Sequence, residues 1–338
     1  MLILDFSQSE FNLQTIKPTT DFEQSVVDFL INWFDDSTRM KVQTSGSTGV
    51  PKQIELTKEN MRKSARMTCK YLRLSKGETA LLAMPVSYIA GKLMLVRAIE
   101  IGLKLICVQP TSTLNWLDFN SQFHSIDFVA LTPMQVEHSI DFVSHCNKLI
   151  IGGAPLSEKV KKQLWPMSNE VYETYAMTET ITHIAFKQVP NQKYKSSGYF
   201  EAFEEVKIKQ DERGCLAIAT PYDNLIITTN DVVEIINDRQ FKRIGRADNI
   251  INSGGIKLFP EQIENLLKPF IPTAFFVTGK KDETLGQKLV LVIEGDEREI
   301  NLQKATLSKY QFPKEIIFID TFPRTESGKI QRNKILLT

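Results

Sequence analysis

The chain has 338 residues, of which 42% are hydrophobic, enough for one large domain with a buried core and a smaller domain beside it. Its 41 basic and 40 acidic side chains leave a formal net charge of +1, so no overall field favours nucleic acid or an acidic membrane surface. Four widely spaced cysteines without a Cys-x-x-Cys pair argue against a disulfide framework and a zinc site, and they fit a reducing cytoplasm.

The N-terminal residues give no sign of an export signal. The start, MLILDFSQSE, lacks a basic region and a long apolar core, and no later apolar run approaches the roughly 20 residues that span a bilayer. We therefore expect a cytoplasmic protein without membrane or nucleic-acid partners. The sequence leaves the oligomeric state open.

Residues 21–186 alternate short β-rich apolar runs with amphipathic stretches, which is typical of βαβ units around a mostly parallel sheet. Asp21 is the expected cap of a first helix, and a second helix is predicted from Thr57 to about Leu72. Buried strands, each followed by a helix-like segment, are predicted at 81–84, 104–108, 127–132 and 148–153.

After about residue 196, strand and turn patterns replace the helices. The segments EEVKIK, CLAIAT, LIITTND and VVEII predict a β-rich subdomain that completes the large domain. The chain then returns to mixed α and β, with a helix from Pro260 to Leu267 and strands in AFFVTG, KLVLVIEG and EIIFID. The polar stretch RIGRADN predicts a boundary, so we expect a large α/β domain at 1–247 and a small α+β domain at 248–338.

A loop of small residues follows the first strand-like segment of the large domain. In VQTSGSTGVPKQIELT, hydroxyl side chains and glycines lead to a lysine and then to a helix. Small residues let backbone amides approach an anion, and the hydroxyls and the lysine add donors and charge, so this loop is predicted to bind phosphate. Its residues are Thr44, Ser45, Gly46, Ser47, Thr48, Gly49 and Lys52.

Two alternatives compete for this loop. A Walker A loop needs four residues between its glycines, but only two separate Gly46 from Gly49, which disfavours a P-loop kinase or GTPase. A mobile Ser/Gly linker is the other alternative, although linkers seldom lie between a strand and a helix with a lysine at the exit.

The loop and three later segments together resemble the adenylate-forming superfamily, which includes acyl- and aryl-CoA ligases, luciferases and the adenylation domains of peptide synthetases. The similarity covers nearly all of the chain from about residue 40 onward, in the same order. The segments are TSGSTGVPK, GGAPLSEKV, YETYAMTET and PRTESGKIQR. The resemblance implies ATP and CoA as substrates and Mg²⁺ as the metal.

The resemblance also implies roles at the nucleotide. Tyr175 is expected to pack on adenine, Thr178 to reach the α-phosphate and Glu179 to ligate Mg²⁺, which prefers oxygen ligands. Asp231 is expected to accept both ribose hydroxyls, with Arg246 also in contact with the ribose. The other adenine-side residues are Gly153, Ala154, Pro155, Thr174 and Ala176, the last in place of a more common glycine.

Each of these residues also has an ordinary structural interpretation. Tyr175 fits a core aromatic and Glu179 a residue in the first turn of a helix. Asp231 fits a turn residue after Asn230. The sequence leaves these alternatives open.

C-terminal motifs complete the implied reaction. Lys329 takes the position of the catalytic lysine, where a cation bridges the attacking carboxylate and the α-phosphate, although such a lysine is usually just solvated. Asp248 matches the interdomain hinge. The loop with Gly254, Gly255 and Lys257 matches the one that lines the pantetheine tunnel, but paired glycines are also an ordinary hairpin turn.

The segment 84–99 corresponds to the acyl pocket of the superfamily. No acidic residue lies between Met84 and Ala98, which disfavours an amino-acid substrate. The Gly91-to-Arg97 spacing, the LTPMQ turn and the compact GGAPLS resemble the o-succinylbenzoate-CoA ligases of menaquinone biosynthesis, whose substrate carries a second carboxylate. Candidate acyl contacts are Tyr88, Gly91, Lys92, Arg97, Thr132, Gln135 and His183. Lys92 and Arg97 also fit solvated helix charges, and His183 fits a structural histidine.

The resemblance thus predicts an AMP-forming acid-CoA ligase with Lys329, Thr178 and Glu179 as catalytic residues. Another aryl- or acyl-CoA ligase is the nearest alternative, and a non-catalytic adenylate-binding regulatory homologue is the alternative of another class. Retention of both Lys329 and Glu179 favours an enzyme. The phosphate loop begins at Thr44, whereas in most members it lies well inside the chain, so we expect a reduced large domain.

Overall fold

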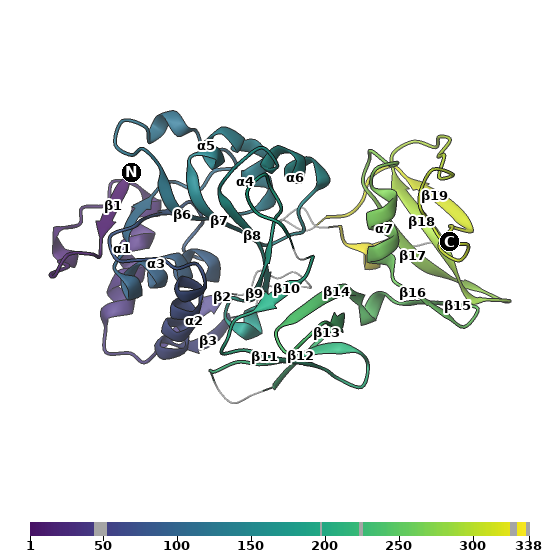
Figure 1. Ribbon diagram of the computed structural model, residues 1–338, viewed down its shortest axis with the longest axis horizontal. Helices are drawn as coiled ribbons and strands as arrows, with labels where there is room; N and C mark the ends of the chain where they lie inside the picture. The colour runs from purple at the N-terminus through teal and green to yellow at the C-terminus, as the bar shows by residue number, and fades with distance from the viewer. Residues whose placement is uncertain (44–52, 197, 223–225, 325–329, 336–338) are drawn as a thin grey trace. The chain divides into compact units, whose positions relative to one another are not determined.

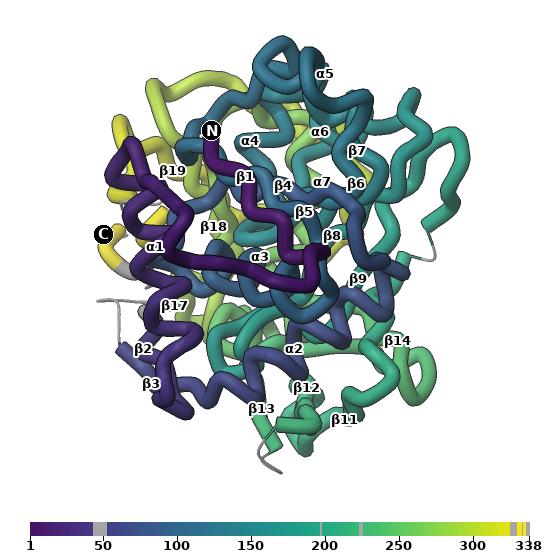
Figure 2. The backbone as a smooth tube through the Cα atoms, turned by 90° about the vertical axis from the view of Figure 1, so that its left-hand side faces the viewer, coloured from purple at the N-terminus to yellow at the C-terminus, as the bar shows by residue number. Residues whose placement is uncertain are grey.

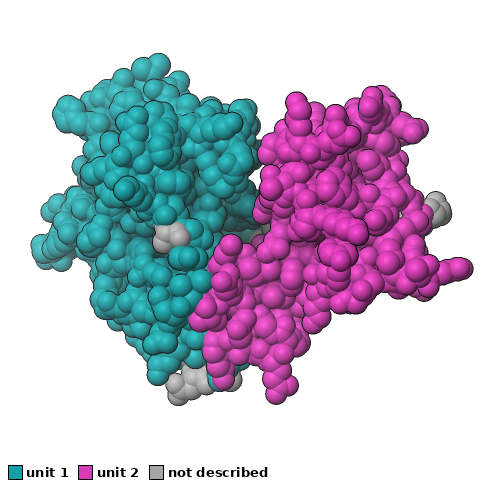
Figure 3. Space-filling model, turned by 45° about the vertical axis from the view of Figure 1, so that its right-hand side comes forward, with its two compact units in different colours: residues 1–208, 218–227, 236–241 teal, residues 209–217, 228–235, 242–338 magenta. Residues whose placement is uncertain are grey.

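The computed structural model describes residues 1–43, 53–196, 198–222, 226–324 and 330–335. The chain divides into two compact units, which Figure 3 colours separately. Unit 1 comprises residues 1–208, 218–227 and 236–241, and unit 2 comprises residues 209–217, 228–235 and 242–338. The domain boundary expected after residue 247 remains a prediction.

Strands and helices alternate through most of the first half of the chain (Figure 1), as the βαβ pattern predicts. The helices are α1 (Asp21–Phe34), α2 (Lys58–Tyr71), α3 (Ile89–Ile101), α4 (Pro133–His138), α5 (Ile140–Ser144) and α6 (Glu158–Leu164), with 3-10 turns at Leu13–Thr15, Trp116–Asp118 and Thr178–Thr180. The strands are β1 (Leu2–Asp5), β2 (Arg39–Gln43), β3 (Gln53–Thr57), β4 (Thr79–Leu82), β5 (Lys104–Cys107), β6 (Ile126–Leu131), β7 (Cys146–Ile151), β8 (Glu170–Ala176), β9 (His183–Gln188) and β10 (Phe200–Ala202).

The later part of the chain is dominated by strands. These are β11 (Lys207–Gln210), β12 (Cys215–Ala219), β13 (Ile226–Ile235), β14 (Gln240–Arg246), β15 (Ile251–Ser253), β16 (Ile256–Leu258), β17 (Phe275–Asp282), β18 (Gly286–Glu294) and β19 (Glu315–Ile319). The helical elements are α7 (Pro260–Leu267) and 3-10 turns at Ala247–Asn249 and Arg332–Lys334. The predicted helix from Pro260 to Leu267 is confirmed, with the proline in its first turn.

The largest sheet in the described residues has 12 strands in the order β1-β5-β4-β6-β7-β8-β9-β10-β14-β13-β12-β11. Its strands β5, β4, β6, β7 and β8 are parallel, while β1 and β9 join them antiparallel. The order reverses at β4, because β5 lies on one side of it and β6 on the other. The predicted α/β class is confirmed, and this reversal is the point at which open α/β sheets usually bind ligands.

Helices cover both faces of the parallel strands (Figures 1 and 2). Helices α4, α5 and α6 pack on one face, where a core cluster joins Leu81, Val129 and Leu149 of the strands to Phe142 and Leu164 of the helices. Helices α2 and α3 pack together on the other face. The central residues of β4, β5, β6 and β7 are buried on both sides, which explains the apolar runs in their sequences.

Three sequence predictions for these elements need correction. Thr20, not Asp21, caps α1, because its hydroxyl accepts the Glu23 amide at 3.2 Å while Asp21 is already helical. A 3-10 turn at Trp116–Asp118, not an α-helix, follows β5. The segments LIITTND and VVEII form one strand, β13, because no turn separates them.

The surroundings of the predicted phosphate loop also differ from expectation. Strands β2 and β3 form an antiparallel pair, with Arg39 opposite Thr57 and Gln43 opposite Gln53. Residues 44–52 therefore connect two strands of a hairpin, and helix α2 begins only after β3. The β-branched and alternating residues of Gln53–Thr57 explain the extra strand.

In unit 2, strands β16, β15, β18 and β17 form a sheet in that order, and β19 pairs with β18 in parallel. Helix α7 packs on this sheet through Ile263 and Leu267, which join a core cluster with Leu289 and Leu291. Unit 2 therefore has its own hydrophobic core.

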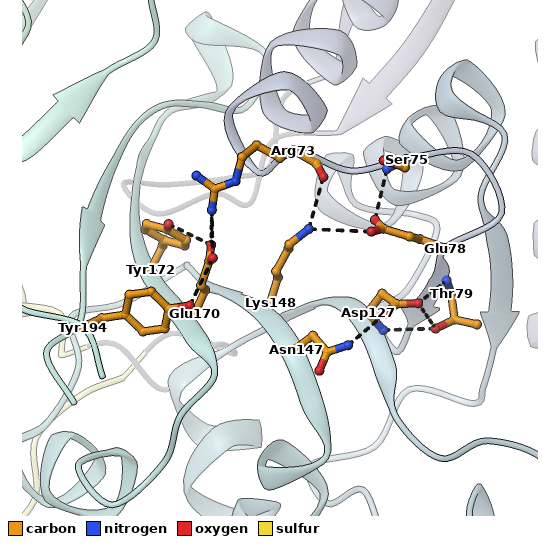
Figure 4. A network of polar contacts seen from close by, with 10 residues as sticks. All are labelled: Arg73, Ser75, Glu78, Thr79, Asp127, Asn147, Lys148, Glu170, Tyr172 and Tyr194. Carbon is orange, nitrogen blue, oxygen red and sulfur yellow. Dashed lines mark hydrogen bonds and ion pairs between the residues drawn. The ribbon is translucent and has the colours of Figure 1, made fainter. Parts of the chain in front are cut away.

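At the amino ends of the parallel strands, charged and polar side chains form a closely paired network (Figure 4). Glu170 at the start of β8 accepts hydrogen bonds from Arg73 at 2.8 and 2.9 Å, from Tyr172 at 3.1 Å and from Tyr194 at 3.2 Å. The other members are Ser75, Glu78, Thr79, Asp127, Asn147 and Lys148. We call this set the amino-edge network. It ties the starts of β4, β6, β7 and β8 together.

Candidate functional site

The carboxyl ends of β6, β7 and β8 carry one group of the residues predicted to contact a ligand. Because these strands are parallel neighbours, the segments after them meet at one edge of the sheet. Thr132 follows β6, Gly152 and Gly153 follow β7, and Ala176 ends β8. We call this edge the carboxyl edge.

Two glycines after β7 leave room at the carboxyl edge. A Cβ atom on Gly152 would lie 2.7 Å from the Thr174 hydroxyl oxygen on β8, so any side chain at Gly152 would clash with the Thr174 side chain. Gly153 has φ +90°, with open space where a side chain would be. Ala154 and Pro155 are exposed beside it. The edge thus presents backbone and small side chains to a flat ligand.

Tyr175 is a buried aromatic residue on β8. Its ring packs edge-to-face on Phe241 at 5.1 Å and on Phe200 at 5.7 Å between ring centroids, and only 6% of the residue is exposed. The structural interpretation of Tyr175 is therefore correct for its ring, and its role at adenine stays a prediction.

A tight turn holds the residues predicted to contact phosphate and metal. Thr178 and Glu179 lie in the 3-10 turn between β8 and β9, and the Glu179 carboxylate is exposed. Ile181 follows with φ +68° and ψ −55°, and the Thr182 amide donates to the Thr180 carbonyl at 2.7 Å. A β-branched residue in this conformation is strained, and such strain gathers at functional sites.

Arg97 on α3 is buried without a carboxylate. Only 2% of it is exposed, and its contacts in the described residues are long ones: 3.5 Å to the Met94 sulfur and 3.5 Å to the Thr182 hydroxyl. The Arg97 Nε has no hydrogen-bond partner among the described residues. Burial lowers the pKa of Arg97 from 12.5 to about 10. A buried cation left unpaired is costly, so the position favours an anion that the described residues do not supply.

His183 on β9 lies in the same buried region. Its Nε2 is 2.8 Å from the Thr68 hydroxyl of α2, and its Nδ1 is 3.4 Å from the Thr182 hydroxyl. Burial, and then the charge of Arg97, hold the pKa of His183 well below 6.5, so the ring is neutral. The structure thus brings together two of the predicted acyl contacts, Arg97 and His183, through Thr182.

Lys92 lies elsewhere, although it is on the same helix as Arg97. Its ammonium is 5.7 Å from the Phe29 ring centroid of α1, and burial lowers its pKa. Five positions along a helix rotate a side chain by roughly 140°, so Lys92 and Arg97 point in different directions. One carboxylate cannot bind both residues.

The remaining acyl candidates have clear structural roles. The Gln135 amide donates to the Ala83 and Thr111 carbonyls, both at 2.9 Å, and its oxygen accepts from Thr132 in a capping box on α4. These bonds use both amide hydrogens of Gln135, which are therefore unavailable to a ligand. A Cβ on Gly91 would lie 2.3 Å from a backbone oxygen, whereas Tyr88 is 46% exposed.

In unit 2, the predicted ribose residue Asp231 pairs with an arginine that sequence reasoning missed. Arg243 donates its Nε to the Asp231 carboxylate at 3.0 Å. Arg246, predicted to contact the ribose, binds Asp248 at 2.5 Å, and Asp248 also accepts from Asn230 at 3.0 Å. The ribose role of Arg246 stays a prediction. Residues three apart on a strand point to opposite faces, so the choice between Arg243 and Arg246 depends on the register of β13 and β14, which sequence alone does not give.

The predicted hinge and CoA segments have ordinary local geometry. Asp248 lies in a 3-10 turn, and its pKa is lowered mainly by the hydrogen bond from Arg246. Gly254 and Gly255, with φ +56° and +82°, form the hairpin turn between β15 and β16, and Lys257 is exposed on β16. Both glycines adopt positive φ because a two-residue hairpin turn requires it.

Several predicted residues lie outside the described residues. These are Thr44, Ser45, Gly46, Ser47, Thr48, Gly49, Lys52 and Lys329. Among the residues that are described, no helix is long and apolar enough to cross a membrane, and no three metal-ligating side chains gather in one place. A single carboxylate such as Glu179 can still hold Mg²⁺ when phosphate oxygens complete its shell.

Comparison with known proteins identifies relatives of the chain. Residues 36–221, more than half of the chain, match the AMP-binding enzyme family. The chain is 28% identical over 323 residues to 2-succinylbenzoate–CoA ligase of Staphylococcus aureus (strain bovine RF122 / ET3-1), covering 86% of this chain. It spans 65% of the length of that relative.

Solved structures show the same fold. An acyl-CoA synthetase (AMP-forming)/AMP-acid ligase II-like protein from Dyadobacter fermentans DSM 18053 is 36% identical with a TM-score of 0.66, and the match covers 95% of both chains. O-succinylbenzoate coenzyme A synthetase from Bacillus subtilis, in complex with ATP and magnesium ion, has a TM-score of 0.69 at 20% identity, covering 87% of this chain and 69% of that one. The second likeness concerns the fold alone.

Proposed function

The chain belongs to the AMP-binding enzyme family, and we propose that it is an AMP-forming acid-CoA ligase acting on o-succinylbenzoate. The observation that carries the choice of substrate is Arg97, a buried guanidinium without a carboxylate partner in the described residues. An aromatic diacid brings two carboxylates, one to react and one to be recognised. The second carboxylate would supply the missing partner of Arg97.

The neighbours of Arg97 support this assignment. Thr182 and His183 follow the turn with Thr178 and Glu179, and Arg97 contacts Thr182, so the buried cation lies beside the segment assigned to phosphate and metal. The neutral His183 ring and the Thr68 hydroxyl add polar groups without adding competing charge. A dry site of this kind strengthens an arginine–carboxylate pair.

In the first step, the reacting carboxylate attacks the α-phosphorus of ATP and pyrophosphate leaves. Lys329 and the loop of residues 44–52 neutralise charge that develops on the phosphate oxygens, and Thr178 donates to the α-phosphate. Glu179 would hold Mg²⁺, which neutralises phosphate charge when bound. The exposed position of Glu179 on the carboxyl edge fits that role.

In the second step, the CoA thiol attacks the acyl carbonyl and AMP leaves, which gives the thioester. Unit 2 carries the residues assigned to this step, with Asp248 as the hinge and Gly254 to Lys257 as the loop along the pantetheine. A rotation about Asp248 would exchange Lys329 for that loop at one nucleotide site. Asp231 and Arg243 would hold the ribose in both steps.

A substrate panel tests the proposal. ATP–pyrophosphate exchange and CoA thioester formation are measured with o-succinylbenzoate, benzoate and a medium-chain fatty acid. We expect o-succinylbenzoate to be preferred, and Arg97→Met to reduce kcat/KM for it by about 100-fold because one buried carboxylate loses its partner. Benzoate, which has no second carboxylate, should lose far less.

Lys92→Met is the matched variant on the same helix. Because Lys92 and Arg97 point in different directions, the loss of selectivity for the diacid should be larger at Arg97. Equal preference for all three acids would identify another CoA ligase of the family, and no exchange with any acid would favour a non-catalytic homologue.

A further inference from the structure

A cavity lies in unit 1, between helix α1, strand β2 and the start of α3. Its volume is about 460 Å³, within the range of small-molecule pockets. Phe29, Met40 and Val86 provide an apolar wall, and Lys92, Arg39 and Lys41 bring three cations to its lining. None of the contacts assigned to the adenylation reaction, apart from the Lys92 candidate, lies in this cavity.

Among the residues that the structure describes, these three cations have no carboxylate partner. In the described part of the chain, neither Arg39 nor Lys41 forms an ion pair, and Lys92 has only its contact with the Phe29 ring. Some surface cations elsewhere in unit 1 are paired, as Lys70 is with Glu204 and Glu205. The cations at this cavity therefore keep their full capacity for an external anion.

The acidic groups of the cavity do not cancel this charge. Asp35 is held by Lys58 at 2.6 Å, and this hydrogen bond lowers its pKa. Asp28 accepts from the Gln24 amide at 2.8 Å and has no ion-pair partner in the part of the chain that the structure describes. The lining therefore carries an excess of positive charge. Lys92 is also half-buried, so burial lowers its pKa unless a bound anion offsets the cost.

We propose that this cavity binds an organic phosphate that carries at least two negative charges. A single carboxylate matches one or two cations, whereas a phosphate group offers three acceptor oxygens to cations that approach from β2 and α3. The volume far exceeds that of phosphate alone, and the apolar wall can cover an organic body. The site is separate from the proposed adenylation reaction and does not depend on it.

Binding of adenosine 3′,5′-bisphosphate, measured by calorimetry at low salt, tests the proposal. Wild-type protein should bind it, and Arg39→Gln/Lys41→Gln should weaken binding by about tenfold, because two exposed charge pairs are lost. The exposed Lys162→Gln, which removes a cation far from the cavity lining, is the matched control and should bind as wild type does.

Two further binding measurements test which kind of phosphate binds and where it binds. Inorganic tripolyphosphate should bind more weakly than the bisphosphate if the apolar wall contributes, and equal affinity would overturn the organic part of the proposal. Lys52→Gln in the phosphate loop should keep the bisphosphate site. If Lys52→Gln removes binding while Arg39→Gln/Lys41→Gln retains it, the anion binds the loop and the proposed site is wrong.

Folding and adenylation are measured alongside binding. Circular dichroism confirms that each variant is folded, and Lys41→Gln alone replaces the double variant if that protein does not fold. ATP–pyrophosphate exchange of the wild-type protein reports on the proposed function separately. Failure of exchange with intact bisphosphate binding, or the reverse, therefore distinguishes the two proposals.

Discussion

At the amino edge of the parallel strands, Glu170 accepts hydrogen bonds from Arg73, Tyr172 and Tyr194 (Figure 4), whereas at the carboxyl edge Glu179 is exposed and has no ion-pair partner in the described residues. The two edges lie at opposite ends of the same parallel strands. At the amino edge, the charged and polar side chains pair with one another. At the carboxyl edge, Glu179 is exposed and can bind a ligand. In the proposed function, stability and binding are thus separated along a single sheet.

Among the variants that test this comparison of the two edges, Glu179→Gln should have the largest effect, and it should act on activity. The amide keeps the shape but loses the charge that a metal requires, so we expect ATP–pyrophosphate exchange to fall by roughly 10²–10³-fold. Because Glu179 is exposed, the thermal midpoint should change little. Exchange at the wild-type rate across a magnesium titration would remove Glu179 from the metal site.

Gly152→Ala tests the close approach at the carboxyl edge. The added methyl would lie 2.7 Å from the Thr174 oxygen, so we expect a loss of about 1–2 kcal/mol in unfolding free energy, together with weaker nucleotide binding. Thr174→Ala in the same chain removes that oxygen and should recover most of the stability. Denaturant unfolding of both single variants and the double variant measures the coupling.

Glu170→Gln tests the amino edge. A neutral amide weakens the hydrogen bonds from Arg73 and from the two tyrosines, and we expect the protein to lose about 1 kcal/mol of stability. Exchange activity should stay at the wild-type rate, which is the reverse of the Glu179→Gln result. A large loss of activity without a loss of stability would contradict the division between the two edges.

The pH dependence of stability should show the smallest effect. The pKa of His183 is lowered in the fold by burial, so below about pH 6.5 the unfolded chain takes up a proton that the folded protein does not. Stability should therefore fall as the pH decreases through this range, and His183→Gln should flatten that slope. His124→Gln, at an exposed position, controls for the loss of an imidazole.

Local sequence determined much of the secondary structure. The apolar run at 104–108 forms β5, the run at 148–153 overlaps β7, and Pro260 starts α7, because burial on both faces and a fixed proline φ act over a few residues. The family match over residues 36–221 agrees with motifs that are also local in sequence.

Only the tertiary structure decided which side chains meet. The sequence offered Lys92 and Arg97 as candidates for one carboxylate, and the helix directs them apart. It gave no sign that Arg243 pairs with Asp231, which the structure shows. The missing carboxylate at Arg97 likewise depends on α2, α3 and β9, which are far apart in the chain. Pairing and burial arise from contacts between distant segments, so residue type and spacing alone cannot determine them.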